Sequence, residues 1–463
     1  MDNVVPEGAR RHYERLVQRA QRDGRVPAVQ AAVYRADRPM WTFEVGTAGD
    51  GVALGPETRF RIGSITKTLT AVLVLQCRDE GLLDLDDRVS DHMGVPEHGE
   101  LTIRRLLSHT AGLQREPYGD IWDTLAVPSL EETLAGLAQA ERVLPSGRRF
   151  HYSNLGFALL GHLVAAKRGG TWFEVLTDRV LHPLDLHLSL EPGSNAATGY
   201  LVDAWSDHAR PEPVTDLGGI APAAQLWGTA ADLARWGSFL ADPRHVDPDG
   251  AVLSADTLTE MRYPVAARDE RVWTASFGLG LIVRPRGDRG LDVGHGGAMP
   301  GFLAETYGRV APGDAADEVP PGLAAAVLLS AGNGDGALGL SPALMDAAVE
   351  RDPADIVPWR PGEPAPAGLR SALGHWWGEG FEHVFRWRNG NLESSGVDDP
   401  AGTPPTVYAV ESADLLRAVS GREIGEQLRL TRDSDGRVVR MHWATYRFTR
   451  EQQTFDGEWV SQP

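Results

Sequence analysis

The sequence predicts an α+β protein in which an antiparallel sheet is built from both ends of a first domain, with a helical region inserted between them. Strand patterns occur near the N-terminus and return from Phe277 onward, while helical patterns fill the stretch between. The later strand patterns are too close together for helical crossovers, which favours antiparallel pairing. Beyond them, short aromatic-rich strands with tight turns predict a small all-β barrel or half-barrel.

The composition is that of a packed globular protein and argues against several partners. Of the 463 residues, 42% are hydrophobic and 24% are charged. The formal net charge of −19 argues against nucleic acid or an anionic membrane as a partner. The single cysteine, Cys77, excludes an intramolecular disulfide and a cysteine-based zinc site. The 14 histidines show no metal-ligand spacing, so we expect no metal and no cofactor.

Neither a targeting segment nor a membrane span is expected. The first residues lack the charged-then-apolar pattern of a secretory signal. No run approaches the roughly 18 uninterrupted apolar residues that a membrane span needs. We therefore expect a cytoplasmic protein.

The first domain is predicted to begin with a helix and two strands. An amphipathic helix is expected near Pro6–Arg22, followed by short strands at Val29–Tyr34 and Trp41–Val45. From Ser64 a segment that is apolar nearly all round runs toward Gly81, a residue type favoured after the end of a helix. This segment predicts a buried core helix.

Further helices and strands complete the first domain. Capping-box patterns at Ser129–Glu132 and Thr171–Glu174 predict the starts of two helices. A last helix is expected to start with Ser341 as N-cap and Pro342 in the first turn. The strands of the second half are expected at Phe277–Val283, Leu291–Val293, Phe302–Tyr307 and Leu323–Ser330.

A proline-rich stretch divides the chain. Asp352–Gly368 contains five prolines, which is typical of a stiff extended linker. After it, Asn389-Gly390 and Asp435-Gly436 are hairpin turn pairs between short strands. We therefore predict a first domain at 1–351, a linker at 352–368 and a β domain at 369–463.

Ser64 and Lys67 form a Ser-x-x-Lys pair at the head of the predicted core helix, on one helix face. A serine hydroxyl needs a nearby base to become a nucleophile. A lysine can be that base only if burial or neighbouring charge lowers its pKa, and the root of an apolar helix meets this condition. On its own the pair is a weak signal, because many helices have a capping serine and a solvated lysine at this spacing.

A second motif follows about ninety residues later. Tyr152 and Asn154 precede a predicted helix at Leu155–Lys167 and place a phenol and an amide on one side of a turn. They offer a proton relay and a dipole that orients substrate. The alternative is a core tyrosine beside an asparagine helix cap.

A third motif, Gly-His-Gly-Gly-Ala at 294–298, follows a predicted strand. Its glycines would let substrate approach the backbone, and the Ala298 N–H can face the Ser64 N–H as an oxyanion pair. The alternative is a glycine-rich hairpin with a surface histidine, His295. Three weak signals in this order are together a strong one.

Together these motifs resemble the serine β-lactamase and penicillin-binding-protein superfamily, specifically its class C-like branch. The resemblance spans roughly Arg25–Arg351 and rests on five segments. They are Phe-Arg-Ile-Gly-Ser at 60–64, Leu-Leu-Ser-His-Thr-Ala-Gly-Leu at 106–113, Tyr-Ser-Asn at 152–154, Trp-Gly-Thr-Ala-Ala-Asp-Leu-Ala-Arg-Trp at 227–236 and Gly-His-Gly-Gly at 294–297. It implies a β-lactamase-like antiparallel sheet with flanking helices and a helical subdomain.

The resemblance also implies roles for the motif residues. Ser64 would be the nucleophile, and Lys67 and Tyr152 would share proton transfer. Asn154 would orient the acyl-side amide and Lys67. His109, in the second of the five segments, is expected to be structural and to pack or cap near the catalytic helix.

The third motif departs from the better-known Lys-Thr-Gly version. His295 stands in place of a lysine that helps to bind a carboxylate, and a histidine is mostly neutral at pH 7. This puts efficient β-lactam hydrolysis in doubt and is familiar in esterases, aminopeptidases and acyltransferases of the superfamily. The implied oxyanion hole is made by Ser64 and Ala298. Candidate substrate-binding residues are Trp227, Gly296, Gly297 and Arg447.

The C-terminal strands resemble lipocalin-like domains appended to many members of the superfamily. They contain four arginines, whose planar fork suits carboxylates. Arg447 flanks an aromatic pair, so we consider that it reaches a substrate carboxylate; the alternative is a solvated arginine on the outer face of a barrel. The four are Arg437, Arg440, Arg447 and Arg450.

The expected function is acyl transfer through an acyl-serine intermediate. The substrate would be a small-molecule or peptide acyl compound, with esterase, amidohydrolase or D-residue aminopeptidase activity. The second candidate resembles the penicillin-binding-protein-type thioesterases, which take a carrier-protein-bound peptide thioester from a nonribosomal assembly line and cyclise it. A non-catalytic binding protein is the third, and the intact Ser64, Lys67, Tyr152 and Asn154 argue against it.

Overall fold

The chain divides into two compact units, Met1–Pro312 with Glu318–Asp355, and Gly313–Asp317 with Ile356–Pro463. The computed structural model describes residues 4–49, 53–268, 271–287, 290–311, 319–334, 338–356, 358–378, 380–400 and 403–456. The ends of the predicted domains at 1–3 and 457–463 therefore lie outside the described residues. No helix in the described ranges is long and apolar enough to cross a bilayer.

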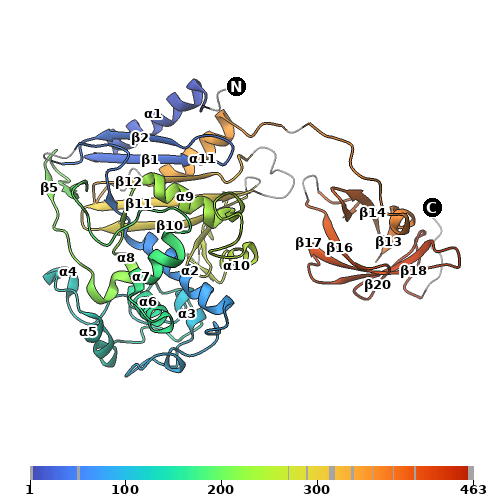
Figure 1. Cartoon of the computed structure of the whole chain (residues 1–463), viewed down its shortest axis with the longest axis horizontal. Helices are drawn as coiled ribbons and strands as arrows, with labels where there is room; N and C mark the ends of the chain where they lie inside the picture. Colours follow the sequence, from blue (N-terminus) through green and yellow to red (C-terminus); the bar gives the residue numbers. More distant parts are fainter. Residues whose placement is uncertain are drawn as a thin grey trace. The chain divides into compact units, whose positions relative to one another are not determined.

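An antiparallel sheet of eight strands forms the centre of the first unit (Figure 1). Its strand order is β2-β1-β12-β11-β10-β9-β8-β7, so strands from the two ends of the unit meet where β1 pairs with β12. The strands are β1 Ala28–Tyr34, β2 Trp41–Gly46, β7 Ala266–Ala267, β8 Ser276–Phe277, β9 Ile282–Pro285, β10 Leu291–Met299, β11 Phe302–Val310 and β12 Ala324–Leu329. This arrangement confirms the predicted fold class.

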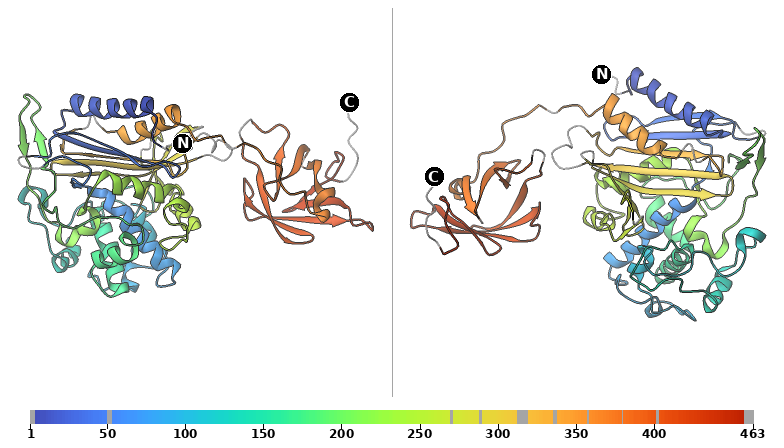
Figure 2. Two further views of the ribbon diagram at one scale, coloured as in Figure 1. Left: turned by 45° about the horizontal axis from the view of Figure 1, so that its top comes forward. Right: turned by 180° about the vertical axis from the view of Figure 1, so that it is seen from behind.

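Helices cover both faces of the sheet, and the views of Figure 1 and Figure 2 agree on this layering. Tyr13 of α1 and Leu344 of α11 join Val29 of β1 in one core cluster. Trp236 of α9 joins Ala32 of β1 in another. Val29 and Ala32 point to opposite faces because side chains alternate along a strand. The helices are α1 Glu7–Asp23, α2 Thr66–Asp79, α3 Ile103–Leu107, α4 Ile121–Thr124, α5 Leu130–Ala135, α6 Asn154–Arg168, α7 Trp172–Leu176, α8 Ala221–Ala224, α9 Ala230–Ala241, α10 Ala255–Met261 and α11 Leu340–Arg351.

The helical region contains the predicted core helix. A 3-10 turn, η1 (Gly63–Ile65), leads into α2, in which twelve residues are buried. The capping boxes at Ser129–Glu132 and Thr171–Glu174 are both present, which confirms the helix starts predicted from them. Two further strand pairs lie outside the main sheet: β3 Phe60–Arg61 with β6 Trp227–Gly228, and β4 Tyr200–Val202 with β5 Ala209–Pro211.

Two predicted strands were placed incorrectly. The apolar stretch 277–283 is not one strand, because Gly280 has a positive φ of 80° and the Gly278 N–H donates to the Leu281 carbonyl at 2.9 Å. This turn separates β8 from β9. The strand predicted at 291–293 extends to Met299 as β10, so the third motif lies within a strand instead of after one.

The start of the last helix also differs from the prediction. Gly339, with φ of 87°, is the N-cap of α11, and Ser341 lies inside the helix. The Ser341 hydroxyl donates to the Ala325 carbonyl at 2.7 Å, so it links the helix to β12 instead of capping it. Described residues 353–356 and 358–366, which follow α11, have no regular secondary structure.

The second unit is a nearly closed antiparallel barrel whose eight strands pair in chain order. Trp377 and Thr449 exchange backbone hydrogen bonds of 2.7 and 3.0 Å, which join the first strand to the residue after the last. Asn389 and Gly390 both have positive φ, as expected for the predicted hairpin turn. The strands are β13 Gly374–Gly378, β14 Phe381–Arg388, β15 Asn391–Gly396, β16 Thr406–Ser412, β17 Leu415–Ser420, β18 Gln427–Arg432, β19 Val438–Trp443 and β20 Tyr446–Phe448, preceded by the 3-10 turn η10 Ala367–Ala372.

Candidate active site

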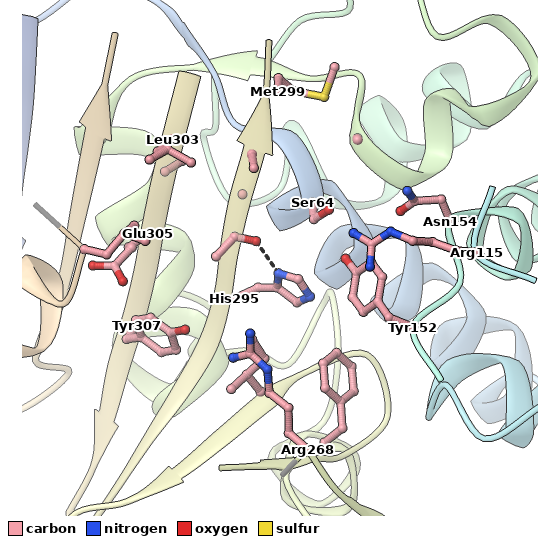
Figure 3. Close-up of a pocket in the computed structure, with 18 of the residues that line it drawn as sticks. Ser64, Arg115, Tyr152, Asn154, Arg268, His295, Met299, Leu303, Glu305 and Tyr307 are labelled. Carbon is pink, nitrogen blue, oxygen red and sulfur yellow. Dashed lines mark hydrogen bonds between the residues drawn. The ribbon is translucent and has the colours of Figure 1, made fainter. Parts of the chain in front are cut away.

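A cleft of about 660 Å³ lies in the first unit beside β10 (Figure 3). Its lining contains residues of all three predicted motifs, which are up to 234 positions apart in the chain. The motif residues in the lining are Ser64, Tyr152, Asn154, His295, Gly296, Gly297 and Ala298.

The backbone of η1 lies against β10 because two glycines leave room for it. Gly63 has a positive φ of 51°, and a Cβ there would be 2.7 Å from the Ala298 nitrogen. A Cβ on Gly297 would be 1.9 Å from the Ile62 oxygen and 3.3 Å from the Ser64 nitrogen. This close approach brings the backbone at Ser64 and Ala298 together, as the predicted oxyanion pair requires.

Lys67 is fully buried at the start of α2, one turn after Ser64. Its Nζ donates to Asn154 Oδ1 at 2.7 Å and to the Ala223 carbonyl at 2.8 Å, and lies 3.1 Å from Ser64 Oγ. Burial holds the pKa of Lys67 well below its usual value, and the Glu116 charge opposes this effect. A neutral amine has two N–H groups and one lone pair. The two carbonyl oxygens take the hydrogens, so the lone pair is left for the Ser64 hydroxyl.

Asn154 is held in one orientation by Glu116, which the sequence analysis did not single out. Asn154 Nδ2 donates to Glu116 Oε1 at 2.7 Å, so the amide oxygen faces Lys67. The Asn154 backbone N–H donates to the Arg115 carbonyl at 2.7 Å. The segment that follows the motif at 106–113 therefore holds Asn154 of the second motif in place.

Tyr152 is half-buried, and its phenol shares a hydrogen bond with Ser64. Burial raises the pKa of Tyr152, and the hydrogen bond to Ser64 opposes this effect. The Lys67 nitrogen lies 4.8 Å from the centre of the tyrosine ring. Ser64, Lys67 and Tyr152 are thus close enough to exchange a proton.

His109 packs against Tyr152 and does not reach the cleft lining. Its ring stacks on the tyrosine ring at 4.2 Å, and its Nδ1 accepts the Ser153 backbone N–H at 3.0 Å. The residue therefore positions Tyr152, which agrees in kind with the predicted structural role.

His295 lies on β10 with only 3% of its surface exposed. Its Nδ1 contacts the Gly296 carbonyl, which can only accept, so Nδ1 holds the proton and Nε2 is a bare acceptor. Within the described residues Nε2 has no hydrogen-bond partner. Burial lowers the pKa of His295 to about 3, so the ring is neutral at pH 7.

Two predicted substrate-binding residues need separate comment. The prediction that Trp227 binds substrate is wrong. Trp227 is 1% exposed, lies on β6 and packs on Phe302 with ring centres 5.4 Å apart. It supports the β3–β6 pair next to η1 and does not line the cleft. Arg447 belongs to the second unit, where its guanidinium donates to the Thr454 carbonyl at 2.8 Å. Its contact with substrate stays a prediction.

The cleft lining also contains charged and polar residues that the sequence analysis missed. The pair Arg115 and Glu116 could have been found, because it lies just beyond Gln114, which follows a motif of the family resemblance. The others stand in no motif; they lie on or directly after strands of the sheet and reach the cleft through the pairing of those strands. They are Arg268, Arg284, Glu305 and Tyr307. In the part of the chain that the structure describes, no side-chain group is arranged to hold a metal ion.

Residues 13–348 match the family model described as Beta-lactamase, and residues 365–450 match a domain of unknown function, DUF7586. Neither the DUF7586 match nor the barrel confirms the expected resemblance of the C-terminal strands to lipocalin-like domains.

Curated relatives align mainly with the first unit. Penicillin-binding protein 4 of Amycolatopsis lactamdurans is 31% identical over 344 residues, which is 69% of this chain and 85% of that protein. Unguisins hydrolase ungD' of Aspergillus campestris is 26% identical over 309 residues, which is 60% of this chain and 55% of that protein. The chain therefore spans only about half of the second relative.

Solved structures of similar fold include both one-unit and two-unit matches. The crystal structure of SurE with D-Leu is 26% identical, has a TM-score of 0.59, and is matched over 96% of this chain and 100% of that chain. A D-stereospecific amidohydrolase from Streptomyces sp. is 23% identical with a TM-score of 0.58, over 73% of this chain and 98% of that chain. The second likeness supports the fold.

Proposed function

The chain belongs to the beta-lactamase family of serine hydrolases, and we propose that it transfers the acyl group of an amide or ester through an acyl-Ser64 intermediate. The observation that carries the proposal is the Lys67 amine. Two oxygens accept from its N–H groups, and its Nζ lies 3.1 Å from Ser64 Oγ, where the lone pair of the neutral amine can take the serine proton. A buried amine with a lowered pKa is a base of the kind that a serine nucleophile needs.

The reaction starts when Ser64 Oγ bonds to the substrate carbonyl carbon and its proton moves to the Lys67 lone pair. The carbonyl electron pair moves to the oxygen, which the N–H groups of Ser64 and Ala298 stabilise. When the carbonyl re-forms, the bond to the leaving group breaks; Tyr152 gives the leaving group a proton and takes in its place the proton that Lys67 received from Ser64. Water or another nucleophile then attacks the acyl ester and gives up its proton to Lys67. The bond to Oγ breaks, and Ser64 regains a proton from Lys67.

A D-configured amino acid residue in the substrate is the preferred choice. The likeness to the SurE structure with D-Leu covers both units at 26% identity, which supports a site that accepts a D-residue. The fold is also shared with a D-stereospecific amidohydrolase. We therefore place the enzyme among amidohydrolases and esterases of small acyl or peptide compounds.

The second candidate is the thioesterase that releases or cyclises a nonribosomal peptide from a carrier protein. The observation that favours it is the second unit, because the penicillin-binding-protein-type thioesterases that the sequence resembles share this two-domain layout. A free amine of the peptide would then replace water as the attacking nucleophile. Product mass separates the two candidates, because the hydrolysed peptide is one water heavier than the cyclised peptide.

Turnover of a p-nitrophenyl ester by Ser64→Ala tests the proposed function. We expect the variant to lose turnover with unchanged circular dichroism. Ser206→Ala is the control, since Ser206 is exposed and lies outside the cleft. Near-wild-type activity of the Ser64→Ala protein would refute the nucleophile and favour a binding protein.

A further inference from the structure

A hollow of about 290 Å³ lies on the outside of the barrel, beside β13 and β20. Trp377, His442 and Arg447 line it. Each of the three is next in sequence to a residue of the buried barrel core, so each points outward, because successive side chains of a strand point to opposite faces. The hollow is therefore distinct from the core, which the barrel fills with its own side chains.

The residues after β20 fold back over this face and form a wall of the hollow. The Arg447 guanidinium donates to the Thr454 carbonyl at 2.8 Å, and Gln452 Nε2 donates to the Gly380 carbonyl at 3.4 Å. These four residues all belong to the lining. The two hydrogen bonds hold the wall against the barrel, and every described residue of the lining lies in the second unit.

A row of cationic residues crosses three strands at the hollow. His442 is directly opposite Arg429 of β18 and Arg447 of β20, and directly opposed side chains share one face of a sheet. Arg440, two positions before His442 on β19, lies on the same face. Within the described part of the chain these three arginines form no ion pair, and Arg429 and Arg447 donate to backbone carbonyls. Like charges on one face of a sheet repel each other, and a bound anion relieves this repulsion.

Carboxylates of the barrel do not cancel this charge. The described lining of the hollow contains no aspartate or glutamate. Glu382, which is opposite Trp377 on β14, contacts His375 Nδ1 at 2.7 Å, and Asp456 shares a hydrogen bond with Thr454. Burial and the three nearby arginines lower the pKa of the histidine in the row, so its ring is neutral at pH 7 and the arginines supply the charge.

Three aromatic side chains also line the hollow. Trp377 is half-buried, whereas Tyr446 and Phe455 are 45% and 87% exposed. Single exposed aromatic residues are ordinary, but three around one hollow form an apolar rim. Aromatic rings offer a flat ligand a large and rigid contact area. The hollow therefore combines surfaces that suit a ring with positive charge that has no carboxylate partner.

We propose that this hollow binds a flat ring that carries a carboxylate or phosphate group. The ring contacts Trp377, and the anion accepts from His442 and from the N–H groups that Arg447 does not donate to Thr454. The planar fork of an arginine suits both anions, because each presents a pair of oxygens to it. A volume of about 290 Å³ is at the lower end of the range for small-molecule sites, so the ligand has one or two rings. The site does not depend on the proposed acyl transfer.

Calorimetric titration of the full chain tests the site with three probes that share one ring system. They are 1-naphthyl phosphate, 1-naphthoate and the neutral 1-naphthol. The quantity compared is the affinity for each anion divided by the affinity for 1-naphthol. We expect a ratio of about ten or more for at least one anion, because a hydrogen bond to a charged group contributes that much. The anion with the larger ratio identifies the charged group of the ligand.

Variants of the lining locate the binding. Arg447→Gln should lower the ratio by about tenfold, and His442→Phe should lower it as well. Trp377→Leu should weaken the binding of all three probes. Arg437→Gln is the control and should keep the wild-type ratio, since Arg437 is exposed and lies outside the lining.

The ratio separates the anion site from the wall and from the cleft. Arg447→Gln also removes the bond to Thr454, but a wall that opens weakens all three probes alike. Anions that bind only in the Ser64 cleft leave the ratio unchanged in both anion-site variants. The proposal would be overturned if neither anion binds more tightly than 1-naphthol, or if the ratio is unchanged in Arg447→Gln and His442→Phe. An equal loss in Arg437→Gln, or unchanged binding by Trp377→Leu, would also overturn it.

Discussion

Gly297→Ala should disable the site without touching any reactive side chain. A Cβ on Gly297 would lie 1.9 Å from the Ile62 oxygen. Non-bonded carbon and oxygen atoms approach to about 3.3 Å, so β10 and η1 must move apart by more than about 1 Å. Oxyanion donors act within a range of about 2.7–3.1 Å, and loss of one donor costs about 10²–10³-fold in kcat. We expect a loss of that size.

An exposed glycine outside the cleft provides the control. A Cβ on Gly94 would meet no atom within 4 Å, and Gly94 has no positive φ. The assay is turnover of a p-nitrophenyl ester by both variants, with thermal unfolding measured in parallel. We expect Gly94→Ala to stay within a few-fold of wild type. Equal activity of the two variants would refute the reasoning that the contact of Gly297 with Ile62 holds the oxyanion hole together.

Tyr152→Phe should lower turnover by about 10²–10⁴-fold, and by more than Asn154→Ala, because it removes a proton carrier; a loss of only about threefold would leave Lys67 to act alone. Glu116→Gln should move the acid limb of the kcat/KM profile to lower pH. The Glu116 charge raises the pKa of Lys67, so its removal keeps the amine neutral at lower pH. An acid limb that stays at the same pH or moves to higher pH would contradict this. Deleting the residues after Asp355 should leave fluorophosphonate labelling of the proposed nucleophile intact, because the described cleft residues all belong to the first unit. Loss of labelling in a folded truncated protein would show that the barrel contributes to the site.

The residues brought together in the cleft could be predicted largely from local patterns. Ser64 and Lys67 are held together by one helical turn, and Tyr152 and Asn154 by the extended residues that lead into the start of α6. Each pair needs only its own sequence to be recognised, and their order along the chain links them. His295 was also recognised from its own local motif, although the sequence analysis did not predict that the motif lies within β10.

What the sequence analysis missed depends on contacts between distant segments. Glu116 orients the Asn154 amide that accepts from Lys67, and its charge also raises the pKa of Lys67; no pattern in either segment predicts these contacts. Arg284 reaches the cleft because β9 pairs with β10, and the break between β8 and β9 was hidden in an apolar run. Trp227 was misplaced because a family-like segment does not reveal which side chain faces the cleft.

Direct observation of the acyl-enzyme tests the central claim most sharply. Wild-type protein mixed with a p-nitrophenyl ester, quenched within milliseconds and digested, should yield a peptide containing Ser64 whose mass has increased by the acyl group. The adduct should be absent from Ser64→Ala and should form slowly in Lys67→Met, because the serine then lacks its base. Turnover of the ester with the acyl group on another residue, or an adduct that forms as fast without Lys67, would contradict the account.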